Sequence, residues 1–342
     1  MNKFTRCLAF VLNVIALIAV AQNTPSGNST PHEVLAFYYP WYGLSGSGDH
    51  GNHWGKINAA EHKTANTLHF PAMGAYSSYN PAVVDSHIDL AKSNGLTGFI
   101  VSWWGQKSYE NHGVSVALKC ANQKNFKISV FWEKAPGKGT EQMNQAVDDL
   151  VYLVSRFGTN SAFLKVDGKS VIFVYERVLA EIPQKSWPAI IDEAHTKAGP
   201  FLLISDGGDE KNVRLFDGFC RYNISWAPVG KSLDALRAWA AQYDGKRVKL
   251  ARQYHRISCA SVIPGYDDSK VRKPGRVVDR QDGQIYRVLW EEAIKAQPDW
   301  IVITSWNEWH EGSEIEPSFE NGDKYLKLTA EYARRYQGST QP

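Results

Sequence analysis

Short apolar runs recur along the chain, and each is bounded by polar, glycine or proline residues. Runs of about four to eight residues with this pattern predict buried β-strands. The strands predicted in this way are Val34–Tyr39, Leu96–Trp103, Lys127–Trp132, Ser170–Tyr175, Phe201–Ser205, Leu215–Cys220, Val248–Tyr254 and Trp300–Thr304.

Segments with apolar residues at helical spacing lie between these strands. In one of them Asn80 and Pro81 mark a helix start, Val84 and Ile88 lie on the apolar stripe, and Gly95 ends the helix. Further helices are predicted near 143–158, 186–198, 232–240, 286–296 and 324–336. Strands that alternate with helices along 342 residues, without an internal linker or repeat, predict a single (β/α)8 TIM barrel.

The first 32 residues have a different composition and are predicted to precede the barrel. Lys3 and Arg6 are followed by an apolar stretch that ends in Ala19-Val20-Ala21, which is typical of a signal peptide. Residues 1–21 are therefore predicted to be a cleaved signal peptide, 22–32 a disordered leader and 33–338 the catalytic domain. The protein is expected to be secreted or periplasmic, and an uncleaved amino-terminal signal anchor is the alternative.

Charge and cysteine content argue against several classes of partner. The formal net charge of +3 falls to +1 when the two basic residues of the signal peptide are removed. The sequence has no basic tail or basic stripe, which argues against nucleic-acid binding. No later apolar run is long enough to span a membrane. The spacing of Cys120, Cys220 and Cys259 matches no zinc site, so we expect no metal. The sequence has no P-loop and no Rossmann glycine fingerprint, so we expect no cofactor. The mature protein is expected to be a monomer.

Aromatic residues are abundant, with 12 Trp, 16 Tyr and 14 Phe. Many of them are needed to fill a large core. A surplus of Trp and Tyr also suits carbohydrate binding, because flat rings stack on the C–H faces of sugars. In a (β/α)8 barrel the active site lies at the carboxyl ends of the strands. The chain's aromatic and acidic residues gather at these predicted ends: Tyr39, Trp41, Trp103, Trp104, Glu133, Glu176, Asp206, Tyr222, Tyr254, Glu308 and Glu311.

The segment Trp306–Gly312, with the sequence WNEWHEG, directly follows the last predicted strand. Its carboxylates, Glu308 and Glu311, are three residues apart, and one turn brings such positions to the same side. Two like charges held together cannot both ionise freely, so their pKa values separate and provide an acid and a base. The alternative is a helix start, where the helix dipole favours Glu.

Several segments resemble glycoside hydrolase family 99, the family of endo-α-1,2-mannosidases and endo-α-mannanases. WNEWHEG is similar to its most specific motif, and the segment 37–43, FYYPWYG, is similar to its opening motif. The pair His53-Trp54, the segment SWWG at 102–105 and the segment PGYD at 264–267 resemble further family segments in the same order. The resemblance spans nearly the whole chain after the leader.

The resemblance implies a retaining hydrolase of α-mannosides in which the substrate's own 2-hydroxyl is the nucleophile. Glu308 is then expected to be the base that takes the 2-OH proton, and Glu311 the acid and base at the leaving oxygen. Two proton-transfer roles suit carboxylates three residues apart. Residues expected to bind an oligosaccharide or polysaccharide are Tyr39, Trp41, His53, Trp54, Trp103, Trp104, Glu133, Tyr222, Tyr254, Tyr266, Asn307, Trp309 and His310.

Where the sequence departs from the family pattern, the departures bear on which substrate is bound more than on the reaction that is catalysed. Glu314 occupies a position where the family commonly has Gln, and residues 43–52 and 106–116 are short and atypical. Two alternative functions are a non-catalytic carbohydrate-binding barrel and a glycan-processing domain of polysaccharide assembly. The presence of both Glu308 and Glu311 favours an enzyme over a binding protein.

Overall fold

The computed structural model describes residues 32–44, 53–207 and 210–338. The predicted signal peptide, and all of the predicted leader except His32, lie outside the described residues. Among the described helices, none is both long enough and apolar enough to cross a membrane.

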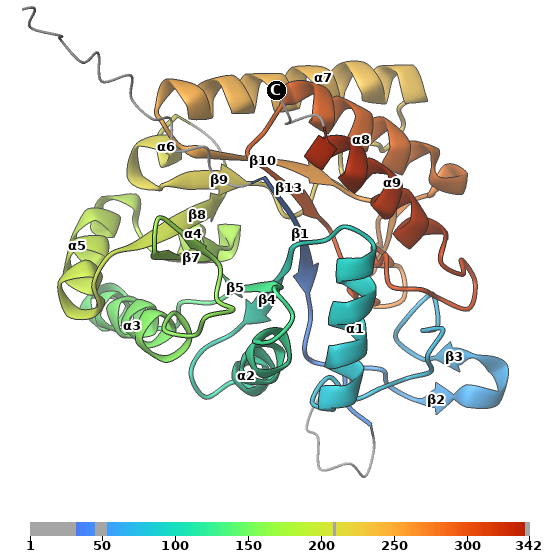
Figure 1. The fold of residues 1–342 in the computed structure, drawn as a ribbon, viewed down its shortest axis with the longest axis horizontal. Helices are drawn as coiled ribbons and strands as arrows, with labels where there is room; N and C mark the ends of the chain where they lie inside the picture. Colours follow the sequence, from blue (N-terminus) through green and yellow to red (C-terminus); the bar gives the residue numbers. More distant parts are fainter. Residues whose placement is uncertain (1–31, 45–52, 208–209, 339–342) are drawn as a thin grey trace, which may run out of the picture.

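Eight parallel strands form a closed barrel, which confirms the predicted fold (Figure 1). Each strand pairs with the next along the chain, β5 pairs with β7, and β13 closes the barrel by pairing with β1. The closing register places Glu33 beside Trp300 and Leu35 beside Val302. The barrel strands are β1 (Glu33–Tyr38), β4 (Gly98–Trp103), β5 (Lys127–Trp132), β7 (Lys169–Val174), β8 (Phe201–Asp206), β9 (Gly218–Cys220), β10 (Ile257–Val262) and β13 (Trp300–Ile303).

Helices follow the strands and cover the outside of the barrel (Figure 1). They are α1 (Pro81–Ser93), α2 (Tyr109–Ala121), α3 (Gly139–Tyr152), α4 (Glu176–Glu181), α5 (Trp187–Ala198), α6 (Asn212–Leu215), α7 (Leu233–Gln253), α8 (Gln284–Ala296) and α9 (Lys324–Gly338). A π-helical turn, Leu153–Phe157, continues α3, and the 3-10 turns are Ala59–Glu61, Gln184–Ser186 and Gln281–Gly283. The short strands are β2 (Ile57–Asn58), β3 (Lys63–Thr64), β6 (Lys165–Val166), β11 (Tyr266–Asp267) and β12 (Val277–Val278).

Alternation along the strands divides the buried core into two layers. On β1, Leu35 and Phe37 face the barrel interior, whereas Val34 and Ala36 pack against the surrounding helices. This division follows from the two-residue period of a strand. Because the barrel interior is packed with side chains, a substrate is accommodated at the rim, where the loops begin.

The seventh predicted strand, Val248–Tyr254, is wrong, because those residues form the end of α7 and the cap after it. The buried positions of α7 include Leu236, Ala240, Val248 and Ala251, which repeat with a helical period and face the barrel. The seventh strand of the barrel is β10, whose sequence ISCASV contains small and polar residues and gives a weaker apolar signal.

Two further boundaries differ from the prediction. Helix α2 was not predicted, although Ser108 caps it by accepting a hydrogen bond from the backbone N–H of Asn111 at 3.3 Å. The sixth predicted strand, Leu215–Cys220, is reduced to Gly218–Cys220, since Leu215 ends α6. The eight-strand count is nevertheless correct.

Candidate active site

The turn after β13 holds the two carboxylates at the carboxyl-terminal rim of the barrel. The Ser305 hydroxyl accepts a hydrogen bond from the backbone N–H of Glu308 at 2.7 Å. The backbone N–H of Glu311 donates to the Glu308 carbonyl at 3.3 Å, which closes the turn. Asn307 ties this turn to β1, because its side chain bonds both the N–H and the C=O of Tyr39, at 2.7 and 3.0 Å. The arrangement fixes the directions of both carboxylates.

Glu308 and Glu311 open into one cavity of about 400 Å³, as the spacing predicts. This volume is within the range of sites that bury small ligands. Eight predicted site residues line it: Tyr39, Trp41, His53, Trp104, Glu133, Tyr222, Glu308 and Glu311. Four lining residues were not predicted: Glu110, Tyr175, Arg177 and Arg272.

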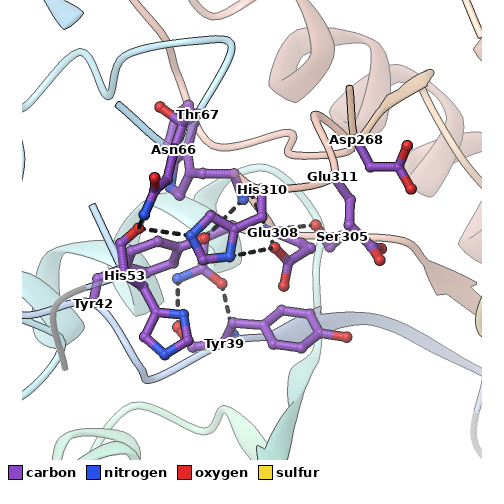
Figure 2. Close-up of polar contacts among 12 residues, drawn as sticks. Tyr39, Tyr42, His53, Asn66, Thr67, Asp268, Ser305, Glu308, His310 and Glu311 are labelled. Atoms are coloured by element: carbon purple, nitrogen blue, oxygen red, sulfur yellow. Dashed lines mark hydrogen bonds and ion pairs between the residues drawn. The ribbon is translucent and has the colours of Figure 1, made fainter. Parts of the chain in front are cut away.

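Glu308 is almost completely buried, with 2% of its surface exposed. Its Oε1 accepts a hydrogen bond from the backbone N–H of His310 at 3.1 Å (Figure 2). Burial raises the pKa of Glu308 well above its usual range, and the neighbouring charges of Glu311 and Glu133 raise it further. Arg272 opposes this shift. In the free site Glu308 therefore retains a proton at pH values where an exposed Glu is ionised.

Glu311 has two charge-stabilising partners. Its Oε2 accepts a hydrogen bond from the Tyr222 hydroxyl at 2.9 Å, and its Oε1 pairs with Nη1 of Arg272 at 3.0 Å. Arg272 also pairs with Asp268 at 2.7 Å, and its side chain is 54% exposed. These contacts fix the direction of the Glu311 carboxyl group, whereas the raised pKa of Glu308 favours a proton on Glu308 when the site is empty.

A third carboxyl group, Glu133, lies directly after β5 and is 4% exposed. Its Oε1 accepts a hydrogen bond from the Ser102 hydroxyl at 2.8 Å, and this hydroxyl accepts one from Nε1 of Trp104 at 3.0 Å. Burial raises the pKa of Glu133 to about 8. A protonated Glu133 can donate a hydrogen bond to a sugar oxygen near neutral pH.

A stack of rings forms one wall of the cavity. The Trp41 and His53 rings are parallel within 2° at 4.8 Å, and His310 stacks on His53 at 5.1 Å. Burial and the nearby His310 lower the pKa of His53 to about 4, so this imidazole is neutral. A ring nitrogen of His310, Nε2, donates to the backbone carbonyl of His53 at 2.7 Å (Figure 2). The wall is therefore flat and uncharged, which suits the face of a sugar ring.

Five predicted site residues support the site without lining this cavity. His310 and Asn307 make the contacts given above. Trp309 donates through Nε1 to the Tyr76 hydroxyl at 3.1 Å, and Trp54 is buried behind it. The Tyr266 hydroxyl accepts a hydrogen bond from Nη1 of Arg272 at 2.9 Å.

The structure places Trp103 and Tyr254 outside the site. Ser102 faces the cavity, so Trp103, the next residue on the strand, points outward, where its Nε1 donates to Asn111 at 2.8 Å. Tyr254 caps α7 just before β10 begins, at the opposite end of the barrel, and its hydroxyl accepts from Arg214 at 2.7 Å. The error at Tyr254 follows from the wrong seventh strand.

The unpredicted lining residues had weak signals in the sequence. Glu110 lies on α2, which was not predicted, and Tyr175 and Arg177 flank Glu176 immediately after β7. Arg272 lies in a long basic loop, where no periodicity distinguishes it from neighbouring Lys and Arg residues. Only the three-dimensional path of that loop brings its guanidinium to Glu311.

Within the described part of the chain, no group of His, Cys, Asp and Glu side chains is arranged to hold a metal ion. Cys120, Cys220 and Cys259 are free thiols, and Cys220 and Cys259 are buried.

Comparisons with known proteins match the whole barrel. The family described as Glycosyl hydrolase family 99 matches residues 30–336. The chain is 25% identical to a glycoprotein endo-alpha-1,2-mannosidase-like protein of Danio rerio, over 93% of this chain and 81% of that protein. It is 24% identical to the glycoprotein endo-alpha-1,2-mannosidase of Rattus norvegicus, over 89% and 74% of the two chains. The solved GH99 endo-alpha-mannosidase from Bacteroides thetaiotaomicron is similar with a TM-score of 0.75 and 25% identity, covering 90% of this chain and 98% of that chain.

Proposed function

This chain belongs to glycosyl hydrolase family 99, and we propose that it is an exported, retaining hydrolase that cleaves α-mannosidic linkages in mannan or mannose-containing glycans. The observation that carries the proposal is that Glu308 and Glu311 open into one cavity with a flat aromatic wall. The similarity to proteins named as endo-α-mannosidases supports the choice of linkage.

In the proposed reaction the sugar's 2-hydroxyl acts as the nucleophile. Glu308 takes the 2-OH proton while O2 attacks C1, and Glu311 donates a proton to the leaving oxygen, which gives a 1,2-anhydro sugar. Water then attacks C1, Glu311 takes a proton from the water, and Glu308 returns its proton to O2. Two inversions at C1 give net retention. Both carboxylates end the cycle in their starting states.

These roles require the proton to be on Glu311 when the reaction begins, whereas the free site favours it on Glu308. The proton can change its position between the two carboxyl groups if the bound substrate alters the partners of Glu311. Arg272 is half-exposed on a loop, so a bound sugar can displace it from Glu311 and leave that carboxyl group free to bond the leaving oxygen. A 2-hydroxyl bonded to Glu308 stabilises the carboxylate there.

Two neighbours fit supporting roles in this scheme. The Tyr222 hydroxyl lies 2.9 Å from Oε2 of Glu311, where it can orient the acid toward the leaving oxygen. Glu133, with its raised pKa, can donate a hydrogen bond to a sugar hydroxyl. Neither group needs to transfer a proton to the reacting atoms.

Separate variants of the two carboxylates test the proposal. Glu311→Gln should lose about 10²–10⁴-fold in turnover of substrates with a poor leaving group, because general acid catalysis is then missing. An α-mannosyl fluoride needs no proton at the leaving atom, so it should recover part of the first step. Glu308→Gln should not recover with the fluoride, because deprotonation of the 2-OH is needed with any leaving group.

The controls separate an enzyme from a binding protein. Both variants should still bind oligosaccharide, since the wall formed by Trp41 and His53 is unchanged. Activity unchanged in both variants would reject the site. Turnover of a 2-deoxy substrate by the wild-type protein, or a glycosyl ester trapped on Glu308, would reject the 2-OH mechanism in favour of ordinary double displacement.

A further inference from the structure

A second and larger cavity, of about 740 Å³, lies beside the proposed active site. It is formed by the segment between β4 and α2 and by one face of α3, which neighbour each other around the barrel (Figure 1). Its lining residues include Trp104, Gln106, Lys107, Gln145, Asp148 and Tyr152.

Trp104 is a wall of both cavities. On one face of its indole the Arg177 guanidinium lies 4.8 Å from the ring centre, and Arg177 lines only the catalytic cavity of the two. The indole Nε1 is fixed by its hydrogen bond to Ser102, so the ring has a defined orientation. A ligand chain that leaves the catalytic cavity past Trp104 therefore enters the second cavity.

The floor of the second cavity is a built polar network. The carboxylate of Asp149, 1% exposed, accepts hydrogen bonds from Nε2 of Gln106 at 3.1 Å and from Nε2 of Gln145 at 2.9 Å. These bonds orient both side-chain amides from opposite sides of the cavity. No hydrogen bond within the described residues occupies the Oε1 atom of either amide, so each can accept a hydrogen bond from a ligand hydroxyl.

The lining combines this pair of amides with an aromatic ring, a carboxylate and an ammonium group. Fixed amides and carboxylates beside an aromatic face are the groups that recognise neutral, hydroxyl-rich ligands such as sugars. Part of the lining comes from residues 106–108, in the segment before α2.

We propose that the second cavity binds further sugar residues of the same glycan whose scissile bond lies between Glu308 and Glu311. The inference rests on the proposed function, since it assumes a glycan in the catalytic cavity. It defines the substrate class more narrowly, as an oligosaccharide or polysaccharide longer than the catalytic cavity can hold. Trp104 then acts as the platform over which the chain passes between the two sites.

The test measures affinity without turnover, using the Glu308→Gln protein and α-mannan oligosaccharides of two to five residues in calorimetry. Affinity should rise at one step of the series, by about 3- to 10-fold, roughly the effect of one or two added hydrogen bonds. Gln145→Ala, added to that protein, should abolish the rise and leave the affinity for the shortest oligosaccharide unchanged. Asp148→Ala, at an exposed position of the same cavity, should reduce the rise.

Asn144→Ala is the matched control, because Asn144 is exposed on α3 and does not line the cavity. It should retain the full rise. If the shortest oligosaccharide binds but affinity rises at no step, or rises equally in the Gln145 and Asp148 variants, the second cavity is not a glycan site and the proposed function is unaffected. If no oligosaccharide binds, both the inference and the proposed function are wrong.

Discussion

At the scale of single residues, Arg272 links the two carboxylates electrostatically. It pairs with Glu311 and also lowers the pKa of Glu308, against the larger effect of burial. The reaction needs one proton on the pair, and the free site holds it on Glu308, so kcat/KM should fall as pH rises through the pKa of Glu308 in the free enzyme. The groups that set this pKa are Glu311, Glu133, Arg272 and the backbone N–H of His310.

Arg272→Gln removes a positive charge that favours ionised Glu308, so the pKa of Glu308 should rise. The alkaline limb of the kcat/KM profile should then move to higher pH, by about one unit for a partly exposed charge. Arg276→Gln is the matched control, since it removes the same charge from the same loop but bonds Ser225 at 2.9 Å. An alkaline limb that stays in place, or moves to lower pH, would contradict the placement of the shared proton on Glu308.

The sequence could predict the site residues that belong to recognisable motifs. It could not predict the residues that reach the site only through the path of a loop. Glu308, Glu311 and Glu133 follow strands, and strand ends in a barrel share one rim, so their meeting was predictable. Both Trp103 and Trp104 were predicted to bind sugar, but only Trp104 lines the cavity. Adjacent residues of a strand point to opposite sides, and sequence alone does not say which of the two faces the cavity. Arg272 reaches the site only through the path of a long loop.

At the scale of elements, α7 and its neighbours show why one strand was misassigned. Val248 and Ala251 lie in a stretch whose apolar residues suit either a strand or the end of a helix. Tertiary packing decides between them, since α7 extends for 21 residues with one face against the barrel. The true strand β10 lies fully buried between β9 and β13, so packing from both sides stabilises it despite its polar residues.

Two glycines test this assignment. A Cβ at Gly218, in β9, would lie 2.7 Å from the Ile257 carbonyl oxygen of β10 and 2.6 Å from Cδ1 of Ile204. Gly218→Ala should therefore lower the free energy of unfolding by about 1–3 kcal/mol or more through overpacking. Gly245, within α7, has open space around its Cβ position, so Gly245→Ala should raise the free energy of unfolding by about 0.5–1 kcal/mol.

The midpoint of urea unfolding measures both effects. If residue 245 lies in a helix and residue 218 lies in a close strand contact, Gly245→Ala should raise the free energy of unfolding and Gly218→Ala should lower it. A loss of stability in Gly245→Ala comparable to that in Gly218→Ala would show that residue 245 does not lie in an exposed helix.

At the scale of the whole molecule, the barrel was predictable because eight strand signals alternated with helix signals, and one wrong strand did not change the count. Export remains a prediction from Lys3, Arg6 and the apolar stretch that follows them. The amino terminus of the exported protein should be Gln22, as read by amino-terminal sequencing. An intact Met1 on membrane-bound protein would instead support the anchor.

The proposed function rests on hydrolysis of α-mannosidic bonds by the carboxyl pair of Glu308 and Glu311. Proton NMR of the products, recorded during the first minutes of reaction with an α-mannan oligosaccharide of four or more residues, tests it most directly. We expect oligosaccharide products whose new reducing end first appears as the α anomer, and no such products from the Glu308→Gln protein. A β anomer formed first, or cleavage undiminished in that variant, would contradict it.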